Sequence, residues 1–301
     1  MPKRVSENVL KGNGEKRFMS KILDKQVLSP VIKLMVVEAP EIARKCLPGQ
    51  FIILRIGEES ERIPLTIADF NRENGTITLV FQEVGKTTKQ LGMLEIGDSL
   101  RDLAGPLGLP SHVENFGAVV CVGGGVGVAP VYPITRALKE AGNHVIGIIG
   151  ARNKELLFWE DKMREASSEL HITTDDGSYV RKGFVSDVLK EIIEGRRKDN
   201  IAMVLAIGPQ PMMRVCCRLT KEYGIKTIVS LNSLMVDGTG MCGCCRVTVG
   251  GKTRFVCVDG PEFDGHQVDF NELALRSAFF QNEERTAMER FSAHCSCGGA
   301  Q

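Results

Sequence analysis

The sequence predicts an α/β plus β protein: an antiparallel β-barrel, then a doubly wound parallel α/β domain, then a small cysteine-rich module. Short strand-like runs separated by Gly and Pro turns occupy the first third of the chain. From residue 118 onward, continuous apolar runs alternate with amphipathic segments, as in a parallel sheet covered by helices on both faces. Towards the C-terminus, three cysteines crowd together at Cys242, Cys244 and Cys245.

These changes of pattern give the expected domain boundaries. The first residues are polar and basic, and the last are polar with a helical pattern, so both lie outside the compact domains. We expect a polar extension at 1–18, a barrel at 19–112, an α/β domain at 113–232, a cysteine-rich module at 233–270 and a helical or mobile tail at 271–301.

The individual elements follow from periodicity and turn residues. In the barrel, Pro48-Gly49, Asn74-Gly75 and Gly97-Asp98 separate strands expected at 31–37, 50–55, 76–82 and 99–103. In the α/β domain, fully apolar runs predict buried strands and amphipathic runs predict helices. The strands are expected at 118–122, 145–149, 203–207 and 227–231, the helices at 129–141, 156–165 and 185–194, a short strand at 247–249 and a tail helix at 270–291.

Composition narrows the classes of function. The chain has 301 residues, with 38 basic and 37 acidic side chains and a net charge of +1, which argues against broad nucleic-acid binding. No uncharged apolar run approaches the roughly 20 residues that span a bilayer. The segment Met1–Ser20 has no signal-peptide pattern, so a cytoplasmic location is expected. Ten cysteines, clustered in a chain of this kind, favour metal ligation over disulfides.

Two glycine-containing loops are candidates for binding a dinucleotide. The first follows the strand at 118–122, and a second follows the strand at 203–207. Glycines let phosphates approach backbone N–H groups at a helix N-terminus, although a plain strand-to-helix turn needs glycine too. The candidate residues are Gly123, Gly124, Gly125, Gly127 and Pro130 in the first loop and Gly208, Pro209 and Met212 in the second.

A further string lies in the barrel. Arg62, Pro64, Leu65 and Thr66 follow the strand at 50–55, and this arrangement resembles the flavin-binding barrel of the ferredoxin-NADP reductase superfamily. The resemblance implies that Arg62 neutralises the pyrophosphate of FAD and that the next residues line the isoalloxazine; a guanidinium suits a diphosphate. It also implies a second phosphate contact at Gly85, Thr87 and Thr88, although these residues could instead form an ordinary helix cap. A nucleotide contact is implied at Asp176, where a simple turn is the alternative.

The cysteine-rich segment has the spacing of an iron–sulfur site. Plant-type [2Fe–2S] ferredoxins use C-x₄-C-x₂-C and a later cysteine. Cys242, Cys245 and Cys257 match the last three positions, and Asp237 occupies the first. Zinc held by the same residues and no metal at all are the alternatives, and Cys244 replaces Cys245 if the register differs.

The order of barrel, nucleotide domain and cluster module resembles the electron-transfer subunit of dihydroorotate dehydrogenase. That family has four cysteine ligands, so Asp237 departs from its pattern. The aspartate and the string from Gly260 to Phe270 resemble the small subunit family of electron-bifurcating NADH-dependent ferredoxin:NADP oxidoreductases, also called sulfide dehydrogenases. This resemblance covers about residues 19–275.

The resemblance implies an oxidoreductase that transfers electrons between a [2Fe–2S] cluster, FAD and NAD(H), with hydride transfer by FAD and no catalytic side chain. It further implies a heterodimer with a larger flavoprotein subunit that carries [4Fe–4S] clusters and binds NADP(H) and ferredoxin. Neither nucleic acid nor a membrane is expected as a partner.

Two alternatives stay open. One is the dihydroorotate dehydrogenase electron-transfer subunit, and the other is a zinc-stabilised nucleotide-sensing module without redox turnover. The sequence leaves undecided the preference for NAD over NADP, the redox potentials, the physiological direction, the stoichiometry of the complex, and any role of the N-terminal extension or of Cys295 and Cys297.

Overall fold

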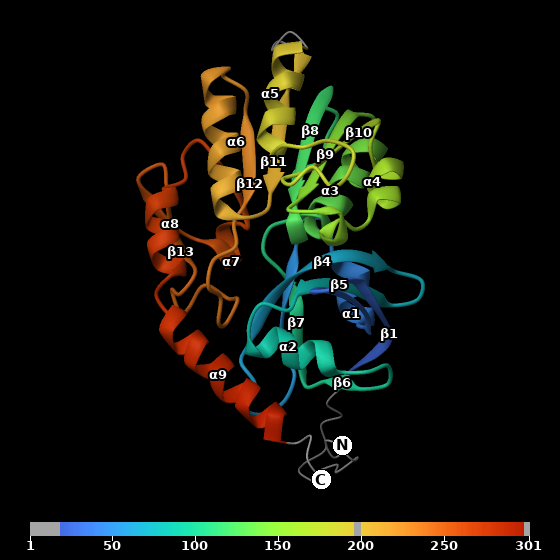
Figure 1. The fold of residues 1–301 in the computed structure, drawn as a ribbon, viewed down its shortest axis with the longest axis vertical. Helices are drawn as coiled ribbons and strands as arrows, with labels where there is room; N and C mark the ends of the chain where they lie inside the picture. Colours follow the sequence, from blue (N-terminus) through green and yellow to red (C-terminus); the bar gives the residue numbers. More distant parts are fainter. Residues whose placement is uncertain (1–18, 196–199, 298–301) are drawn as a thin grey trace.

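Figure 1 shows the fold of the computed structural model, in which the barrel lies below the α/β domain and the C-terminal elements run along one side of both. The structure describes residues 19–195 and 200–297, with side chains up to Ala293. The predicted extension at 1–18 and the side chains of Cys295 and Cys297 therefore lie outside the described residues. No helix in the described ranges is long and apolar enough to cross a membrane.

The barrel is a seven-stranded antiparallel sheet in the order β6-β1-β2-β5-β4-β3-β7. It has its own core, in which Ile52, Leu79 and Phe81 are buried. The strands are β1 (Ser20–Ser29), β2 (Ile32–Glu38), β3 (Phe51–Arg55), β4 (Ile63–Asn71), β5 (Thr76–Gln82), β6 (Ser99–Leu100) and β7 (Asp102–Leu107), with helices α1 (Pro40–Lys45) and α2 (Lys86–Met93).

The α/β domain is a six-stranded sheet in the order β10-β9-β8-β11-β12-β15. All its strand pairs are parallel except that of β15 with β12. Its elements are β8 (Ala118–Gly124), α3 (Val128–Glu140), β9 (His144–Ala151), α4 (Glu160–Ala166), β10 (Glu169–Thr174), α5 (Val185–Gly195), β11 (Met203–Ile207), α6 (Gln210–Glu222), β12 (Thr227–Ser230) and the later strand β15 (Glu262–Asp264), with short 3₁₀ turns at Gly125–Gly127 and Lys154–Leu156.

Alternate residues of the central strand β8 face the two helical layers, as a doubly wound sheet requires. Val120 and Val122 pack in one core with α5 and α6. Val119 and Cys121 pack in a second core with α3 and α4. The predicted fold class is therefore confirmed in its first two parts: an antiparallel barrel and a doubly wound parallel sheet.

The C-terminal module shares its core with the α/β domain. Its elements are β13 (Arg246–Val249), β14 (Lys252–Phe255), α7 (Val256–Asp259), α8 (Phe270–Ser277) and α9 (Gln281–Cys297). Cys245 and Cys257 belong to the same buried cluster as Val229 of β12 and Leu273 of α8. Both the edge strand β15 and helix α8 thus join the module to the nucleotide domain.

Some elements differ from the expectation for local reasons. The helix expected at 156–165 begins at Glu160, because Trp159 has a left-handed backbone with φ 58° that interrupts the helix. The strand expected at 99–103 is divided at Arg101. The tail helix is two helices, separated after Ser277. The strands β1, β10 and β15 were not predicted, because their sequences mix polar and apolar residues without a clear period.

Candidate functional site

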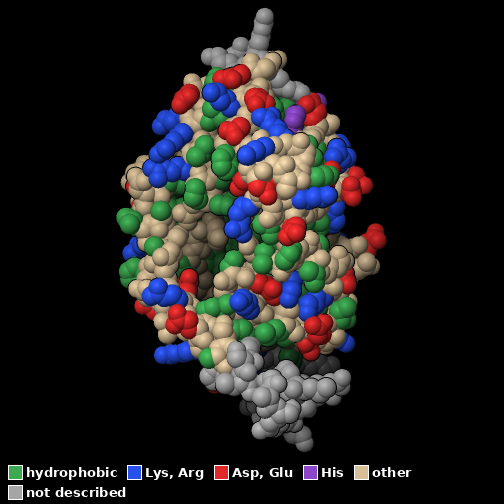
Figure 2. All heavy atoms as spheres, viewed as in Figure 1, with side chains coloured by type: hydrophobic (Ala, Val, Ile, Leu, Met, Phe, Trp, Pro, Cys, Tyr) green, Lys and Arg blue, Asp and Glu red, His purple; other side chains and the backbone are tan. Residues whose placement is uncertain are grey.

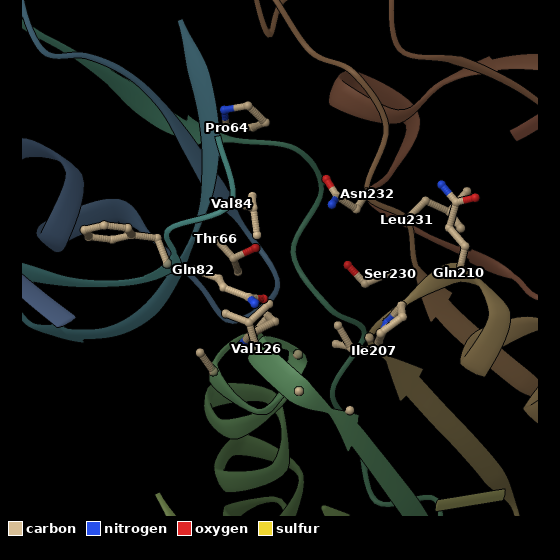
Figure 3. Close-up of a pocket in the computed structure, with 18 of the residues that line it drawn as sticks. Pro64, Thr66, Gln82, Val84, Val126, Ile207, Gln210, Ser230, Leu231 and Asn232 are labelled. Atoms are coloured by element: carbon tan, nitrogen blue, oxygen red, sulfur yellow. The ribbon is translucent and has the colours of Figure 1, made fainter. Parts of the chain in front are cut away.

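A large cavity lies where the barrel, the α/β domain and the C-terminal module meet. Its volume is about 1720 Å³, well above the roughly 300–1,000 Å³ of ordinary small-molecule pockets. Figure 2 shows it as a hollow left of centre. In Figure 3, Thr66 and Gln82 of the barrel face Ile207 and Asn232 of the α/β side across an open space. The cavity has room for more than one extended cofactor.

The barrel wall of the cavity carries Arg62, Pro64, Leu65 and Thr66, the residues predicted to contact FAD and called here the flavin string. Antiparallel pairing sets Thr66 of β4 opposite Phe51 of β3, and both line the cavity with Pro64 and Leu65. Arg62 is exposed just before β4, and its Nε donates a 2.9 Å hydrogen bond to the carbonyl oxygen of Val236. The guanidinium is thereby held at the cavity while pointing toward the cysteine-rich loop.

The predicted second phosphate contact forms the start of α2. Gly85 is the N-cap residue, and the Thr88 hydroxyl accepts the Gly85 N–H at 3.0 Å. The Thr87 hydroxyl donates to the carboxylate of Glu61. Thr88 lines the cavity, whereas Gly85 and Thr87 lie beside it. A methyl group on Gly85 would meet nothing within 4 Å, so the space in front of this backbone is open.

The two glycine-containing loops lie against each other at the carboxyl ends of adjacent strands. β8 and β11 are parallel neighbours, which brings Gly123 opposite Ile207. A Cβ on Gly127 would collide with the backbone carbonyl of Ile207, and one on Gly124 would collide with the sulfur of Met212. The close approach of two backbones therefore explains Gly127, whereas Gly124 leaves room for the side chain of Met212.

The structure gathers most of the predicted nucleotide residues in the one cavity. Gly123 and Asp176 are outside it, and Asp175, next in the chain, lines it instead. The Asp176 carboxylate accepts the Ser178 N–H at 2.9 Å, which is the turn alternative considered above. The predicted residues that line the cavity are Arg62, Pro64, Leu65, Thr66, Thr88, Gly124, Gly125, Gly127, Pro130, Gly208, Pro209 and Met212.

Sequence reasoning missed a third wall of the cavity. The segment after β12, from Leu231 to Val236, lines it, as do Phe280 and neighbours in the C-terminal helices. Ser233 is buried there, and its hydroxyl has no partner among the described residues. A buried hydroxyl without a partner is costly unless a ligand supplies one, so this wall fits a bound polar cofactor. No motif distinguishes this segment in the sequence.

The cysteine-rich loop holds two thiols close together. Cys245 and Cys257 are buried, and their sulfur atoms are 3.3 Å apart. This is far longer than the roughly 2.05 Å of a disulfide and close to the separation of two thiolates on one tetrahedral metal ion. Burial, reinforced by the Cys245 thiol, raises the pKa of Cys257 to about 12. A buried pair of this kind ionises when a metal supplies positive charge.

Asp237 begins the same loop. Its carboxylate accepts the N–H groups of Thr239 and Cys242, both at 2.9 Å. The hydrogen bond from Thr239, together with that from Cys242, lowers the pKa of Asp237, so the carboxylate is ionised at neutral pH. Across residues 19–195 and 200–297, no three His, Cys, Asp or Glu side chains converge closely enough to enclose a metal. The structure brings two of the predicted ligands together and places the other two in the adjoining turn.

The cysteine-rich loop is packed directly on the barrel. Gly238, with φ 77°, lies so close to it that a Cβ would stand 2.7 Å from Leu107 and 2.9 Å from Ile53. On the other side of Asp237, Val236 accepts the hydrogen bond from Arg62. Asp237 is therefore flanked by two contacts with the barrel that carries the flavin string.

A buried carboxyl joins the three parts of the molecule. Glu262 of β15 accepts a hydrogen bond from the hydroxyl of Ser111, in the segment linking the barrel to β8. Its Oε1 is also 3.0 Å from where a Cβ on Gly49 would lie. Burial raises the pKa of Glu262.

This raised pKa predicts a pH-dependent stability. The folded protein holds an extra proton at pH values between the unfolded pKa, about 4.3, and the higher folded pKa, so stability falls as pH rises through that interval. Glu262→Gln keeps an acceptor for Ser111 and cannot ionise. We expect it to be more stable than the unsubstituted protein at pH 8, by on the order of 1 kcal/mol, and to lose the advantage near pH 4. Thermal unfolding at both pH values measures this, and an unchanged pH dependence would contradict it.

The comparisons with known proteins agree with this geometry. Residues 232–269 match the iron-sulfur cluster binding domain of dihydroorotate dehydrogenase B, and residues 121–218 match the oxidoreductase NAD-binding domain. A dihydroorotate dehydrogenase B (NAD(+)), electron transfer subunit homolog from Thermotoga maritima is 47% identical, over 85% of this chain and 89% of its own. The electron transfer subunit from Desulforamulus reducens is 33% identical, over 83% and 99%. The chain belongs to the dihydroorotate dehydrogenase B electron-transfer subunit family.

Solved structures extend the likeness. One similar chain comes from a structure of NADH-dependent reduced ferredoxin-NADP oxidoreductase that gives insights into flavin-based electron bifurcation. It is 43% identical to this chain, with a TM-score of 0.85, and the match covers 94% of this chain and 99% of that one. A ferredoxin reductase in carbazole 1,9a-dioxygenase, 18% identical over 69% of this chain and 66% of its own with a TM-score of 0.58, shows the shared reductase fold alone.

Family membership confirms several predictions. This electron-transfer subunit is an NAD(H)-dependent oxidoreductase whose cofactors are FAD, a [2Fe–2S] cluster and NAD(H). The iron–sulfur match covers Asp237, Cys242, Cys245 and Cys257 and favours the cluster over the zinc alternative. The relatives are electron-transfer subunits of larger enzymes, which indicates a larger partner subunit.

Proposed function

We propose that this subunit belongs to a flavin-based electron-bifurcating ferredoxin:NADP oxidoreductase and carries electrons between its [2Fe–2S] cluster, FAD and NAD(H). The observation that carries the proposal is the meeting of the barrel and the two nucleotide loops at one cavity, whose third wall, Leu231–Val236, leads directly into the cysteine-rich loop packed on the barrel. The 43% identity to the solved ferredoxin-NADP oxidoreductase chain supports the choice of complex.

On the barrel side, Arg62 would neutralise the FAD pyrophosphate, and Pro64, Leu65 and Thr66 would line the isoalloxazine. The open backbone at Gly85, with Thr87 and Thr88, would receive the second phosphate contact. The Arg62 Nε hydrogen bond to Val236 supports this role, because it fixes the guanidinium without using its two terminal nitrogens. FAD supplies the chemistry, exchanging a hydride with NAD(H) and single electrons with the cluster.

On the nucleotide side, the glycine loops would cradle the NAD(H) pyrophosphate. Gly123, Gly124, Gly125, Gly127 and Pro130 form the first loop, and Gly208, Pro209 and Met212 form the second. Asp175 is the better candidate than Asp176 for a contact with the adenosine ribose, because Asp175 lines the cavity and Asp176 is engaged in its own turn.

At the cluster, Asp237, Cys242, Cys245 and Cys257 would be the ligands. The 3.3 Å separation of the Cys245 and Cys257 sulfurs suits ligands of the same iron. Asp237 and Cys242 would then bind the other iron. The Asp237 carboxylate is ionised and accepts a hydrogen bond from the Cys242 N–H, which holds the two residues close together. Contacts of Val236 and Gly238 with the barrel would hold this site beside the flavin.

The partner would be a larger flavoprotein subunit that carries [4Fe–4S] clusters and binds NADP(H) and ferredoxin. The iron–sulfur match at residues 232–269 corresponds to one cluster module. Electrons of low potential would therefore reach ferredoxin through clusters of the partner chain. A dihydroorotate dehydrogenase complex is the second candidate, favoured by the names of the relatives in the family. Asp237 in place of a cysteine favours the first.

Anaerobic titration with NADH tests the proposal. We expect NADH to bleach the flavin absorption of the purified complex and to produce the EPR signal of a reduced [2Fe–2S] centre. With NADPH as the electron donor, the complex should reduce NAD⁺ and ferredoxin together, each reduction depending on the other. Reduction of orotate instead would establish the second candidate, and absence of iron and acid-labile sulfide would contradict both.

A further inference from the structure

Helix α9 supplies one wall of the cofactor cavity. Phe280, just before its first turn, and Glu283, Glu284 and Ala287 within it all line the cavity. These positions are spaced three and four residues apart and so share one face of a helix. Leu275 and Phe279, by contrast, are 76% and 75% exposed and do not line it. One face of α9 therefore lines the cavity, while the rest of the helix presents mainly polar residues to solvent.

The helix spans the cavity between two attachments. At one end, Gln210 at the start of α6 donates a 2.7 Å hydrogen bond to the hydroxyl of Ser277, the last residue of α8. At the other, α9 packs against α2. Figure 1 shows α9 running diagonally from α8 along the flank of the barrel towards α2. α9 therefore runs from the end of α8, beside the second nucleotide loop, to helix α2, whose first turn is the proposed phosphate contact.

We propose that the α9 face formed by Phe280, Glu283, Glu284 and Ala287 binds the adenosine half of FAD. This inference rests on the proposed function, in which Arg62 and the start of α2 hold the FAD pyrophosphate. The isoalloxazine lies on the Pro64–Thr66 side of that pyrophosphate, so the adenosine must extend to the other side. α9 is the element packed on α2 there.

The side chains of the face suit adenosine and not phosphate. It offers an aromatic ring, a small residue and two carboxylates, with no cation among the four. Carboxylates accept hydrogen bonds from the adenine amino group and the ribose hydroxyls, whereas they repel a diphosphate. An aromatic ring gives apolar contact area to a flat base. NAD(H) is the less suitable occupant, because the hydrogen bond from Gln210, beside its second loop, goes to Ser277 of α8, before this face begins.

Comparison of FAD with FMN tests the inference in the full chain, because FMN lacks the adenosine half. We expect Phe280→Ala to weaken FAD binding by the flavin-free protein about tenfold or more. Ala287→Trp, which puts a large side chain into the cavity from the helix surface, should weaken FAD binding at least as much. Neither variant should change the affinity for FMN. Fluorescence quenching of each flavin measures the dissociation constants.

Leu275→Ala is the matched control, since Leu275 is an exposed apolar residue of the same region that does not line the cavity. It should leave both affinities unchanged. Equal losses of FAD and FMN affinity in Phe280→Ala and Ala287→Trp would show that α9 only supports the fold and would overturn the inference. A raised KM for NADH with unchanged FAD affinity would also overturn it. Failure of the unsubstituted protein to bind either flavin would instead contradict the proposed function.

Discussion

Cys245→Ser and Cys257→Ser are each expected to abolish the [2Fe–2S] absorption while FAD stays bound. The two thiols form a buried pair 3.3 Å apart, and a serine hydroxyl in that place is a poor replacement for a thiolate. Leu65, beside the other residues predicted to contact FAD, packs against the barrel core and not against the core that holds Cys245 and Cys257, so the contacts with FAD should survive. Iron and acid-labile sulfide analysis, together with the visible spectrum, measures both effects in one preparation.

Two neighbouring variants determine the register of the ligands. Cys244→Ser should retain the cluster, because Cys245, and not Cys244, is separated from Cys242 by the two residues that the ligand pattern requires. Asp237→Cys should retain it with a shifted midpoint potential, because a thiolate replaces a carboxylate in the ligand set. An EPR-monitored redox titration measures the shift. Loss of the cluster in Cys244→Ser would show that Cys244 is the ligand, and an unmoved midpoint in Asp237→Cys would remove Asp237 from the set.

Gly127→Ala is expected to lower kcat/KM for NADH by about 100-fold. The added methyl group would collide with the backbone carbonyl of Ile207, so the two nucleotide loops must move apart. A displacement of about 1 Å in a loop that positions a reactant is enough to cost a factor of this size. NADH oxidation with an artificial electron acceptor such as ferricyanide measures the loss without requiring the partner subunit.

Gly195→Ala is the matched control for this substitution. Gly195 ends α5 in the same domain, and a methyl group there would meet nothing within 4 Å. It should leave kcat/KM for NADH unchanged. Comparable activity in the two variants would show that the loops do not bind NADH, whereas a loss of FAD from Gly127→Ala would show that the cavity collapses as a whole.

The nucleotide domain was the part most completely predicted from sequence. The strands β8 and β11 are continuous apolar runs, because both their faces are covered by helices, and such runs are plain in the chain. Strand β15 could not be predicted in this way, because its three residues form no continuous apolar run. It is a three-residue edge strand that pairs with β12 only because the chain returns after the cysteine-rich module. Its residue Glu262 gave no signal of its own, and its raised pKa comes from burial among segments distant in sequence.

The candidate site divides in the same way. The spacing of Cys242, Cys245 and Cys257 after Asp237 indicated an iron–sulfur module, because ligand spacing is a local property of the chain. The choice of Asp175 over Asp176, by contrast, depends on which carboxylate turns toward the cavity. Two adjacent acidic residues look alike in sequence, and a hydrogen bond to Ser178 separates them.

By itself the sequence predicted the chemistry of this protein: a barrel with an arginine that family resemblance assigns to FAD, a nucleotide domain with glycine loops, and four iron ligands marked by their spacing. Only the tertiary structure decided how the barrel and the glycine loops share one cavity and how the cysteine-rich loop packs on the barrel beside it. The hydrogen bond between Arg62 and Val236 joins residues 174 positions apart, and helix α9 reaches the barrel from the far end of the chain. Such contacts depend on packing between domains, and no local pattern encodes them.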